Sequence, residues 1–180
     1  MPDGSLKLRG RVCAVLGANV DTDLIYPGRY LNITDREKTA EHLFELAYPE
    51  IGPNLQAGDF IVAGKNFGCG SSREQAAAAL KFAGAGAVIA ASFARIFFRN
   101  AINLGLPAII APEAGESCEA GDELSLDLVK GEIHNRTKGS VIAAASLDAR
   151  AAELLAAGGL IPYLKRQYAG GRRNPCPGIA

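Results

Sequence analysis

The stretch that decides the fold is Asp59-Phe-Ile-Val-Ala-Gly-Lys-Asn-Phe-Gly-Cys-Gly-Ser-Ser-Arg-Glu-Gln-Ala76. Its first part, Asp59 to Gly64, is typical of a short buried β-strand, because a continuous apolar run ends at a glycine. From Ser72 to Phe82 the sequence is dense in alanine, a strong helix former, and predicts a helix. The connection between them contains Gly68 and Gly70, which allow the backbone to turn tightly. The sequence therefore predicts a strand, a tight turn and a helix in direct succession.

The same alternation continues along the middle of the chain. Residues 87–91 predict a second buried strand, residues 93–104 a second helix and residues 107–111 a third strand. This order implies parallel pairing through right-handed crossovers. In the second helix we interpret five side chains at helical spacing as mainly core, namely Phe93, Ile96, Phe97, Ala101 and Leu104.

A strand and a long polar connection precede this alternating region. The strand is predicted over residues 6–16, and residues 17–34 form a loop that is long for a connection. Thr34 or Asp35 can cap a helix over residues 36–47. The apolar stripe of that helix would be Leu43, Leu46 and Ala47.

The C-terminal part has a different pattern. Residues 123–129 alternate apolar and polar side chains, and residues 132–137 return after a Lys-Gly turn, which predicts a hairpin. Two helices are predicted over residues 147–157 and 160–168. We therefore expect an α/β domain with an extra β layer over residues 1–168. The tail, residues 169–180, is rich in Gly, Pro and Arg and is predicted to be flexible.

Composition and charge exclude several classes of partner. Of the 180 residues, 48% are hydrophobic and 21% charged, which is ordinary for a globular protein. Nineteen basic side chains balance nineteen acidic ones, so nothing favours a nucleic acid or a membrane surface as the partner. The N-terminal residues lack the apolar stretch of a signal peptide, and no segment reaches the length of a membrane span. We expect a cytoplasmic protein.

The cysteines and histidines do not form a metal-binding pattern. Four cysteines are scattered without a C-x-x-C pair, namely Cys13, Cys69, Cys118 and Cys176. We interpret them as reduced thiols. His42 and His134 lie in unrelated segments. No metal site is expected from this chain alone.

The start of the alanine-rich helix is the candidate site. Its free N–H groups and positive dipole end point above the glycine-rich turn. We place Arg73 in the first helical turn, where a carboxylate would be favoured, so the cation opposes the dipole. An anion bound by the amides and the guanidinium would account for this arrangement. A plain turn with a serine cap and a solvent-exposed arginine accounts for it equally well, and both interpretations stay open on the spacing alone.

Nucleotide binding is disfavoured at this site. Gly68-x-Gly70 follows a strand but lacks the third glycine of the dinucleotide fingerprint, and the Walker pattern is absent.

Four ordered blocks carry a family resemblance. They are Asn19-Val-Asp-Thr-Asp23 with Pro27 and Tyr30-Leu31, then Phe67-Gly-Cys-Gly-Ser-Ser-Arg-Glu-Gln-Ala76, Ala91-Ser-Phe-Ala-Arg-Ile-Phe-Phe-Arg-Asn-Ala101 and Asn103-Leu-Gly105. In order and spacing these blocks resemble the swivelling domain of the aconitase superfamily in its separate small-subunit form, as in 3-isopropylmalate dehydratases. The resemblance spans roughly residues 8 to 165. It implies a three-layer β/β/α swivelling domain with a short central parallel sheet and a hairpin-rich β layer.

The resemblance also implies a reaction and a partner. In this family a large subunit binds a [4Fe-4S] cluster through three cysteines, and the small subunit closes over it. The implied reaction is the reversible dehydration and hydration of a hydroxy dicarboxylate. Ser71 matches the serine that acts as the base, and Arg73 matches the arginine that clamps a substrate carboxylate. Ser72 is interpreted as the neighbouring cap and anion contact. Cys69 is not expected to be a cluster ligand, because one thiolate cannot hold a cluster.

The loop over residues 21–34 corresponds to the family's substrate-sensing loop. Asp23 is expected to organise the site by hydrogen bonds, and Arg29 is a candidate contact for a carboxylate. The position after Tyr30-Leu31 is apolar in isopropylmalate enzymes and arginine in homoaconitase-type enzymes. Here it is Asn32, followed by Ile33, which fits neither pattern. Because Asn32 carries no charge for a third carboxylate, an alkylated malate is favoured.

Other functions remain as alternatives. A dimethylmalate- or homoaconitate-type dehydratase small subunit would use the same residues on another substrate. A non-catalytic anion-binding module would need only the helix start and the arginine. The isolated small subunit could form a homo-oligomer, because the surface that meets the large subunit would be exposed.

Overall fold

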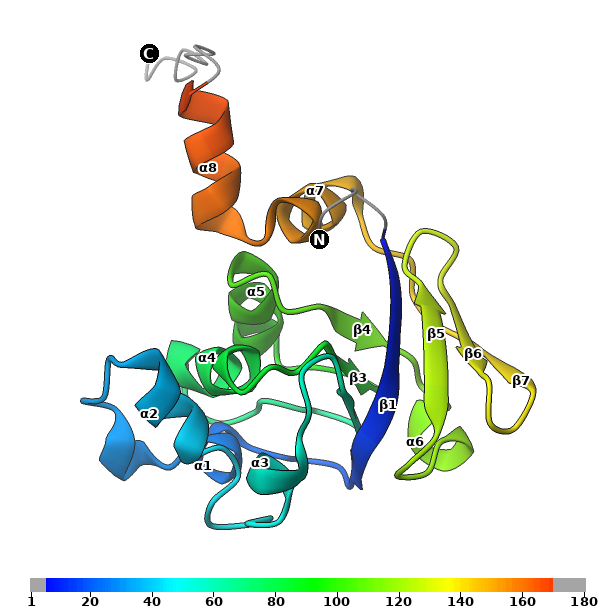
Figure 1. Ribbon diagram of the computed structural model, residues 1–180, viewed down its shortest axis with the longest axis horizontal. Coiled ribbons are helices and arrows are strands. Elements are labelled where there is room, and N and C mark those ends of the chain that lie inside the picture. Colours follow the sequence, from blue (N-terminus) through cyan, green and yellow to red (C-terminus); the bar gives the residue numbers. More distant parts are fainter. Residues whose placement is uncertain (1–5, 170–180) are drawn as a thin grey trace.

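A seven-stranded sheet forms the centre of the molecule in the computed structural model, which describes residues 6–169 (Figure 1). The strand order is β4-β3-β2-β1-β5-β6-β7. The strands are β1 (Lys7–Leu16), β2 (Phe60–Ala63), β3 (Ala87–Ala90), β4 (Ala108–Ile110), β5 (Glu123–Asp127), β6 (Glu132–Asn135) and β7 (Ser140–Ala143). Strands β1 to β4 pair in parallel, and β5 to β7 add to the other edge of β1 as an antiparallel set.

Strand β1 belongs to both halves of the sheet. Its first half, Lys7 to Arg11, pairs antiparallel with β5. Its second half, Val12 to Leu16, pairs parallel with β2, and the register shifts between Val12 and Ala14. A bulge of this kind bends a strand and increases its twist. The antiparallel set therefore turns away from the plane of the parallel set without any break in the sheet (Figure 1).

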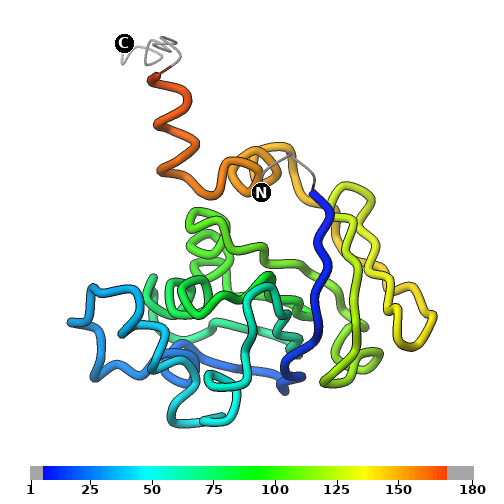
Figure 2. The backbone as a smooth tube through the Cα atoms, viewed as in Figure 1, coloured from blue at the N-terminus to red at the C-terminus, as the bar shows by residue number. Residues whose placement is uncertain are grey.

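Helices connect the strands and close the ends of the chain. They are α1 (Thr22–Ile25), the 3₁₀ turn η1 (Gly28–Tyr30), α2 (Arg36–Glu41), α3 (Ile51–Asn54), α4 (Glu74–Phe82), α5 (Arg95–Asn103), α6 (Ala114–Ser117), α7 (Ala149–Ala157) and α8 (Leu160–Ala169). The backbone trace in Figure 2 shows α8 extending away from the body of the molecule. Within residues 6–169, no helix combines the length and the apolar character needed to cross a membrane.

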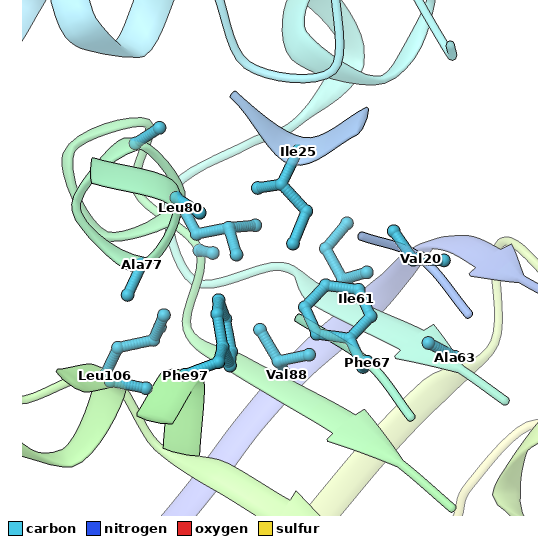
Figure 3. Packing of buried hydrophobic residues seen from close by; sticks show 14 of the residues in the cluster. Val20, Ile25, Ile61, Ala63, Phe67, Ala77, Leu80, Val88, Phe97 and Leu106 are labelled. Atoms are coloured by element: carbon cyan, nitrogen blue, oxygen red, sulfur yellow. The ribbon is translucent and has the colours of Figure 1, made fainter. Parts of the chain in front are cut away.

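The first of two cores lies between the parallel strands and the helices. Ile61 of β2 and Val88 of β3 point toward Leu80 of α4 and Phe97 of α5, and all four are buried (Figure 3). Because side chains alternate along a strand, the neighbouring residues must face the opposite side.

The second core lies on that opposite side, between the two β sets. Phe60 and Ile89 of the parallel strands share it with Leu126 of β5 and Ile133 of β6. Leu155 of α7 belongs to the same cluster. One face of the parallel sheet thus meets helices and the other meets a β layer. The expected β/β/α architecture is confirmed, with its two β layers joined through β1.

The predicted helices differ from the observed ones at their ends, most of all the helix predicted over residues 36–47. The one predicted over residues 36–47 ends at Glu41, because Phe44 adopts a left-handed backbone (φ 57°) and turns the chain. Phe44 is buried in place of Leu46, which is 58% exposed, so the predicted apolar stripe is wrong at Leu46. The helix predicted from Ser72 begins at Glu74.

Other differences are smaller. Ile96 is 39% exposed and not core, because it lies on the outer side of α5. Strand β7 and the short helices α1, α3 and α6 were not predicted, since each spans only four residues beyond a predicted turn or loop. The predicted flexible tail lies outside the described residues, except for Ala169 at the end of α8.

Candidate active site

The candidate site is built where two loops cross at one edge of the parallel sheet. One loop follows β1 and the other follows β2, and backbone bonds tie them together. Asn19 N donates to Lys65 O (2.8 Å), Gly68 N to Val20 O (2.7 Å) and Thr22 N to Cys69 O (2.9 Å). The carboxyl ends of adjacent parallel strands meet at the same edge, which is where ligands bind in open α/β sheets.

Two glycines give the β2–α4 loop its path. Gly68 and Gly70 have φ angles of 74° and 90°, in the left-handed region that other residues rarely adopt. A β-carbon on Gly68 would also overlap the ring of Phe97. Phe97 in turn packs edge-on against Phe67, with ring centroids 5.2 Å apart. The loop is therefore pressed against the aromatic part of the core, and Ser71 comes directly after it.

Ser71 and Ser72 lie on the surface at the start of α4. Both side chains are exposed, and the Ser71 hydroxyl has no hydrogen-bond partner among residues 6–169. The Ser71 carbonyl accepts a long bond from Thr22 Oγ1 (3.5 Å), which links it to α1. The prediction that Ser72 caps the helix is wrong. Arg73 occupies the N-cap position, where the backbone is extended (ψ 117°), and it makes no side-chain cap bond because a guanidinium cannot accept one.

This shift changes the electrostatics of the helix start. Arg73 stands before the first turn and not within it, and Glu74 is the acidic residue of that turn. A carboxylate there is favourable toward the helix dipole. The predicted opposition between Arg73 and the dipole is therefore weaker than expected. The charge of Arg73 is instead balanced by Asp23.

Asp23 connects Arg73 to the neighbouring loop. Its Oδ1 atom forms an ion pair with Arg73 Nη1 and accepts a bond from Gly28 N (3.1 Å). A β-carbon on Gly28 would lie 3.1 Å from Asp23 Oδ1 and 3.2 Å from Arg73 Nη1. Asp21 positions this group by capping α1, since its Oδ1 accepts from Asp23 N and Leu24 N.

The two side chains of the ion pair differ in how much of their surface is exposed. The Arg73 side chain is 23% exposed and the Asp23 side chain 56%. A charge-assisted bond of this kind is strong and directional. The two loops thus bring together three candidate residues from distant segments of the sequence, namely Ser71, Arg73 and Asp23.

Arg29, Asn32 and Ile33 lie further along the first loop. Arg29 Nη2 bonds Glu45 Oε1 (2.6 Å). Asn32 is exposed, and Ile33 N donates to Tyr30 O (2.9 Å). No contact within the described residues joins any of these three to Ser71 or Arg73.

A cluster around Glu45 was missed by sequence reasoning. Glu45 Oε1 also accepts from Tyr30 Oη (3.0 Å), and Glu45 Oε2 lies 2.6 Å from His42 Nδ1. The rings of Tyr30 and His42 stack with centroids 3.6 Å apart. The bond from His42, followed by those from Tyr30 and Arg29, lowers the pKa of Glu45 against the opposing effect of burial. The three-residue spacing of His42 and Glu45 was the only signal of it.

The described part of the chain does not supply a metal-binding set. Within residues 6–169, no group of three or more His, Cys, Asp or Glu side chains could hold a metal ion. Cys13, Cys69 and Cys118 are free thiols. Burial raises the pKa of the Cys13 and Cys118 thiols, which favours their neutral form. These residues do not fit an iron–sulfur cluster.

Comparisons with known proteins identify the family of the chain. Residues 53–113 match the Aconitase C-terminal domain family. The 3-isopropylmalate dehydratase small subunit of Moorella thermoacetica is 54% identical over 86% of this chain and 93% of its own length. The methanogen homoaconitase small subunit of Methanothermobacter thermautotrophicus is 52% identical over 88% and 91%. The crystal structure of 3-isopropylmalate dehydratase from Methanocaldococcus jannaschii has a TM-score of 0.85 at 46% identity, covering 92% of this chain and 98% of that one.

Proposed function

This chain belongs to the 3-isopropylmalate dehydratase small-subunit family of the aconitase superfamily, and we propose that it is the small subunit of a heteromeric hydro-lyase. The reaction is the reversible dehydration and hydration of a hydroxy dicarboxylate, most simply the interconversion of 3-isopropylmalate and 2-isopropylmalate in leucine biosynthesis. The observation that carries the proposal is that the same two loops are joined by the Asp23–Arg73 ion pair and by the bond from Thr22 Oγ1 to Ser71 O.

Ser71 is the proposed base. It removes the proton from the carbon next to a substrate carboxylate, the hydroxyl group leaves from the adjacent carbon, and a double bond forms between the two. A serine hydroxyl is a poor base near neutral pH, so its anion needs nearby positive charge and the exclusion of water. Arg73 provides the charge, and closure against the large subunit would exclude the water. The Ser71 hydroxyl, which has no hydrogen-bond partner within residues 6–169, is available for this role.

Arg73 is the proposed carboxylate clamp. Its guanidinium can bind a carboxylate through two parallel bonds, which lysine cannot do. In the absence of substrate Asp23 occupies part of this fork. Asp23 therefore holds the guanidinium in place for the substrate carboxylate. Ser72, exposed beside Arg73, is proposed as a second contact to the same anion.

The large subunit completes the enzyme. We assign the [4Fe-4S] cluster to that partner, as the family resemblance implies, where it would supply Lewis-acid chemistry to the substrate hydroxyl. The described residues of this chain offer no ligand set for it. We place the heteromer in the cytoplasm. The isolated small subunit exposes the surface meant for its partner, and we expect it to self-associate in that form.

Substrate choice is assigned to the loop after η1. Asn32 and Ile33 present an amide and an apolar side chain, so an alkylmalate is the preferred substrate class. A dimethylmalate or homoaconitate substrate is the alternative, and the 52% identical homoaconitase small subunit keeps the latter open.

Reconstitution tests the proposal. The chain is combined anaerobically with its cluster-loaded large subunit, and unsaturated acid formation is followed in the ultraviolet with isopropylmalate, dimethylmalate, homocitrate and citrate. We expect turnover of an alkylmalate and a loss of at least about 10²-fold in kcat for Ser71→Ala, as for removal of a general base. Ser140→Ala, an exposed serine at the start of β7, serves as the matched control and should leave kcat unchanged.

Two outcomes would contradict the proposal. Full activity in Ser71→Ala would remove Ser71 from the base role. No turnover of any hydroxy acid by a cluster-loaded complex would favour a non-catalytic anion-binding module instead.

A further inference from the structure

The loop assigned to substrate choice is bound by Glu45, a side chain from a different segment, through two of its residues. We propose that Glu45 is a positioning residue that fixes the loop of residues 28–33, and through it the substrate preference of the site. This inference rests on the proposed function, since it concerns which substrate that site accepts. Glu45 does not touch the Ser71–Arg73 group in the structure.

The backbone of the loop forms only a short turn, although Tyr30 N donates to Pro27 O (3.0 Å) and Ile33 N to Tyr30 O (2.9 Å). The 3₁₀ turn η1 has three residues and begins at Pro27 without a side-chain cap. Its closing bond, Leu31 N to Gly28 O, is long (3.3 Å). Short 3₁₀ turns have poor hydrogen-bond geometry and are marginal by themselves. Side-chain contacts to this turn therefore add to the support of Asn32 and Ile33, which follow it.

Glu45 bonds two consecutive side chains of this turn, Arg29 and Tyr30, which lie just before Leu31 and Asn32 in the chain. Its Oε1 atom accepts from Arg29 Nη2 (2.6 Å) and from Tyr30 Oη (3.0 Å). Its Oε2 atom lies 2.6 Å from His42 Nδ1, and the His42 ring stacks on Tyr30 at 3.6 Å with planes 7° apart. Arg29 also lies over the Tyr30 ring, with its Cζ 4.7 Å from the ring centroid. One carboxylate thus connects three side chains that also pack on one another.

The backbone that presents Glu45 is strained. Phe44, directly before it, has a left-handed φ of 57° although it is a bulky residue and fully buried. Such a conformation is unfavourable and persists only where the surroundings require it, commonly at functional sites. Phe44 N donates to Ile25 O (2.9 Å), which anchors the turn to α1. Helix α1 also carries Asp23. The turn before Glu45 and the candidate active site are therefore both anchored to α1.

An alternative role for Arg29, as a substrate clamp, predicts the opposite effect of changing Glu45. If Arg29 is itself a substrate clamp, Glu45 competes with the substrate for its guanidinium. Removing the charge of Glu45 would then strengthen substrate binding. If Glu45 positions the loop, removing its charge must weaken binding of the preferred substrate and reduce discrimination between substrates.

The experiment uses the assembled enzyme with Glu45→Gln and Tyr30→Phe, singly and combined. Tyr30→Phe removes only the hydroxyl and keeps the ring that stacks on His42. We expect Glu45→Gln to raise KM for isopropylmalate about tenfold while kcat stays within about twofold, since a misplaced binding group affects binding before chemistry. The ratio of kcat/KM for isopropylmalate to that for homoaconitate should fall. Tyr30→Phe should add little to Glu45→Gln, because both act on one contact network.

Glu41→Gln is the matched control. Glu41 lies at the end of α2, is exposed and has no side-chain partner within residues 6–169, so its substitution removes one charge close to Glu45 without touching the loop. A lowered KM in Glu45→Gln, or an unchanged substrate ratio, would overturn the positioning role.

Hydrogen exchange of the isolated chain gives a readout that does not need activity. Glu45→Gln should speed amide exchange over residues 28–33 while leaving residues 65–71 unchanged. Unchanged exchange would overturn the inference even if the enzyme is active. Faster exchange together with absence of any turnover would instead contradict the proposed function and leave the anchoring role of Glu45 in place.

Discussion

Gly68 has a backbone conformation that favours glycine and also lies where a side chain would not fit. It has a left-handed φ of 74°, and its α-carbon lies against the Phe97 ring, where a side chain has no room. We expect Gly68→Ala to lower the free energy of unfolding by about 2–5 kcal/mol, the sum of left-handed strain and overpacking. Urea denaturation followed by circular dichroism measures it.

Gly139 supplies the comparison. It has nearly the same φ (69°) but nothing within 4 Å of the position of a β-carbon. Gly139→Ala should therefore cost only about 1–2 kcal/mol, the strain alone. Equal losses at the two sites would show that the Phe97 contact is not rigid.

Residues whose role depends on local chemistry were predictable from the sequence. The glycine-rich turn pointed to Arg73 at the helix start, and the resemblance added Ser71 and Asp23. Glu45 was not predictable, because it meets Arg29 and Tyr30 only after Phe44 takes a left-handed turn. A helical pattern over residues 36–47 gives no sign of that turn, since its stabilising contact is the tertiary bond from Phe44 N to Ile25 O.

At the scale of elements, a buried carboxylate ties the antiparallel strands to their turns. Asp122, just before β5, is 4% exposed. Its Oδ2 atom accepts from Glu119 N (2.9 Å) and Asn135 Nδ2 (2.7 Å), and lies 3.6 Å from Lys138 Nζ. Burial alone would raise the pKa of Asp122, but these donors together lower it below its ordinary value.

The lowered pKa sets the direction of a pH effect. A carboxylate that is more acidic in the folded state stabilises the fold above its ordinary pKa and loses that contribution as the pH falls below about 4. Asp122→Asn should lower the free energy of unfolding by about 1–3 kcal/mol at pH 7, as for a buried charged hydrogen-bonding group. The difference from the native chain should shrink toward pH 3. Urea denaturation at pH 7, 5 and 3 measures the loss of stability and its dependence on pH.

Glu116→Gln is the control for that series. Glu116 is exposed on α6 and has no ion pair within residues 6–169. Its substitution should change stability by less than about 0.5 kcal/mol at every pH. A pH-independent deficit in Asp122→Asn would show that the ionised form is not what stabilises the strands.

For the whole molecule, the two β layers were predicted but their continuity was not. The apolar run of residues 59–64 predicted a central parallel strand, and the alternation over residues 123–129 predicted the hairpin. The sharing of β1 depends on the register shift between Val12 and Ala14. Such a bulge is a response to tertiary pairing on both edges, and the single predicted strand over residues 6–16 carries no signal of it.

This continuity has a consequence for unfolding. The first core contains Leu80 and the second contains Leu126, both at most 1% exposed, and β1 contributes to each. Neither layer can separate without breaking β1, so the described domain should unfold in one cooperative step. Leu80→Ala and Leu126→Ala should each lower the free energy of unfolding by about 2–5 kcal/mol and shift a single transition.

A test of cooperative unfolding needs probes that report on both cores. Hydrogen exchange of β3, next to the first core, and of β6, next to the second, should accelerate together in either variant, because global unfolding exposes both. Leu46→Ala, at a side chain 58% exposed, is the matched control and should change stability by less than about 0.5 kcal/mol. If Leu126→Ala accelerated exchange only in β6 and split the transition in two, the antiparallel layer would be an independent unit. The bulge in β1 would then be a hinge between the layers and not the joint that makes them one cooperative structure.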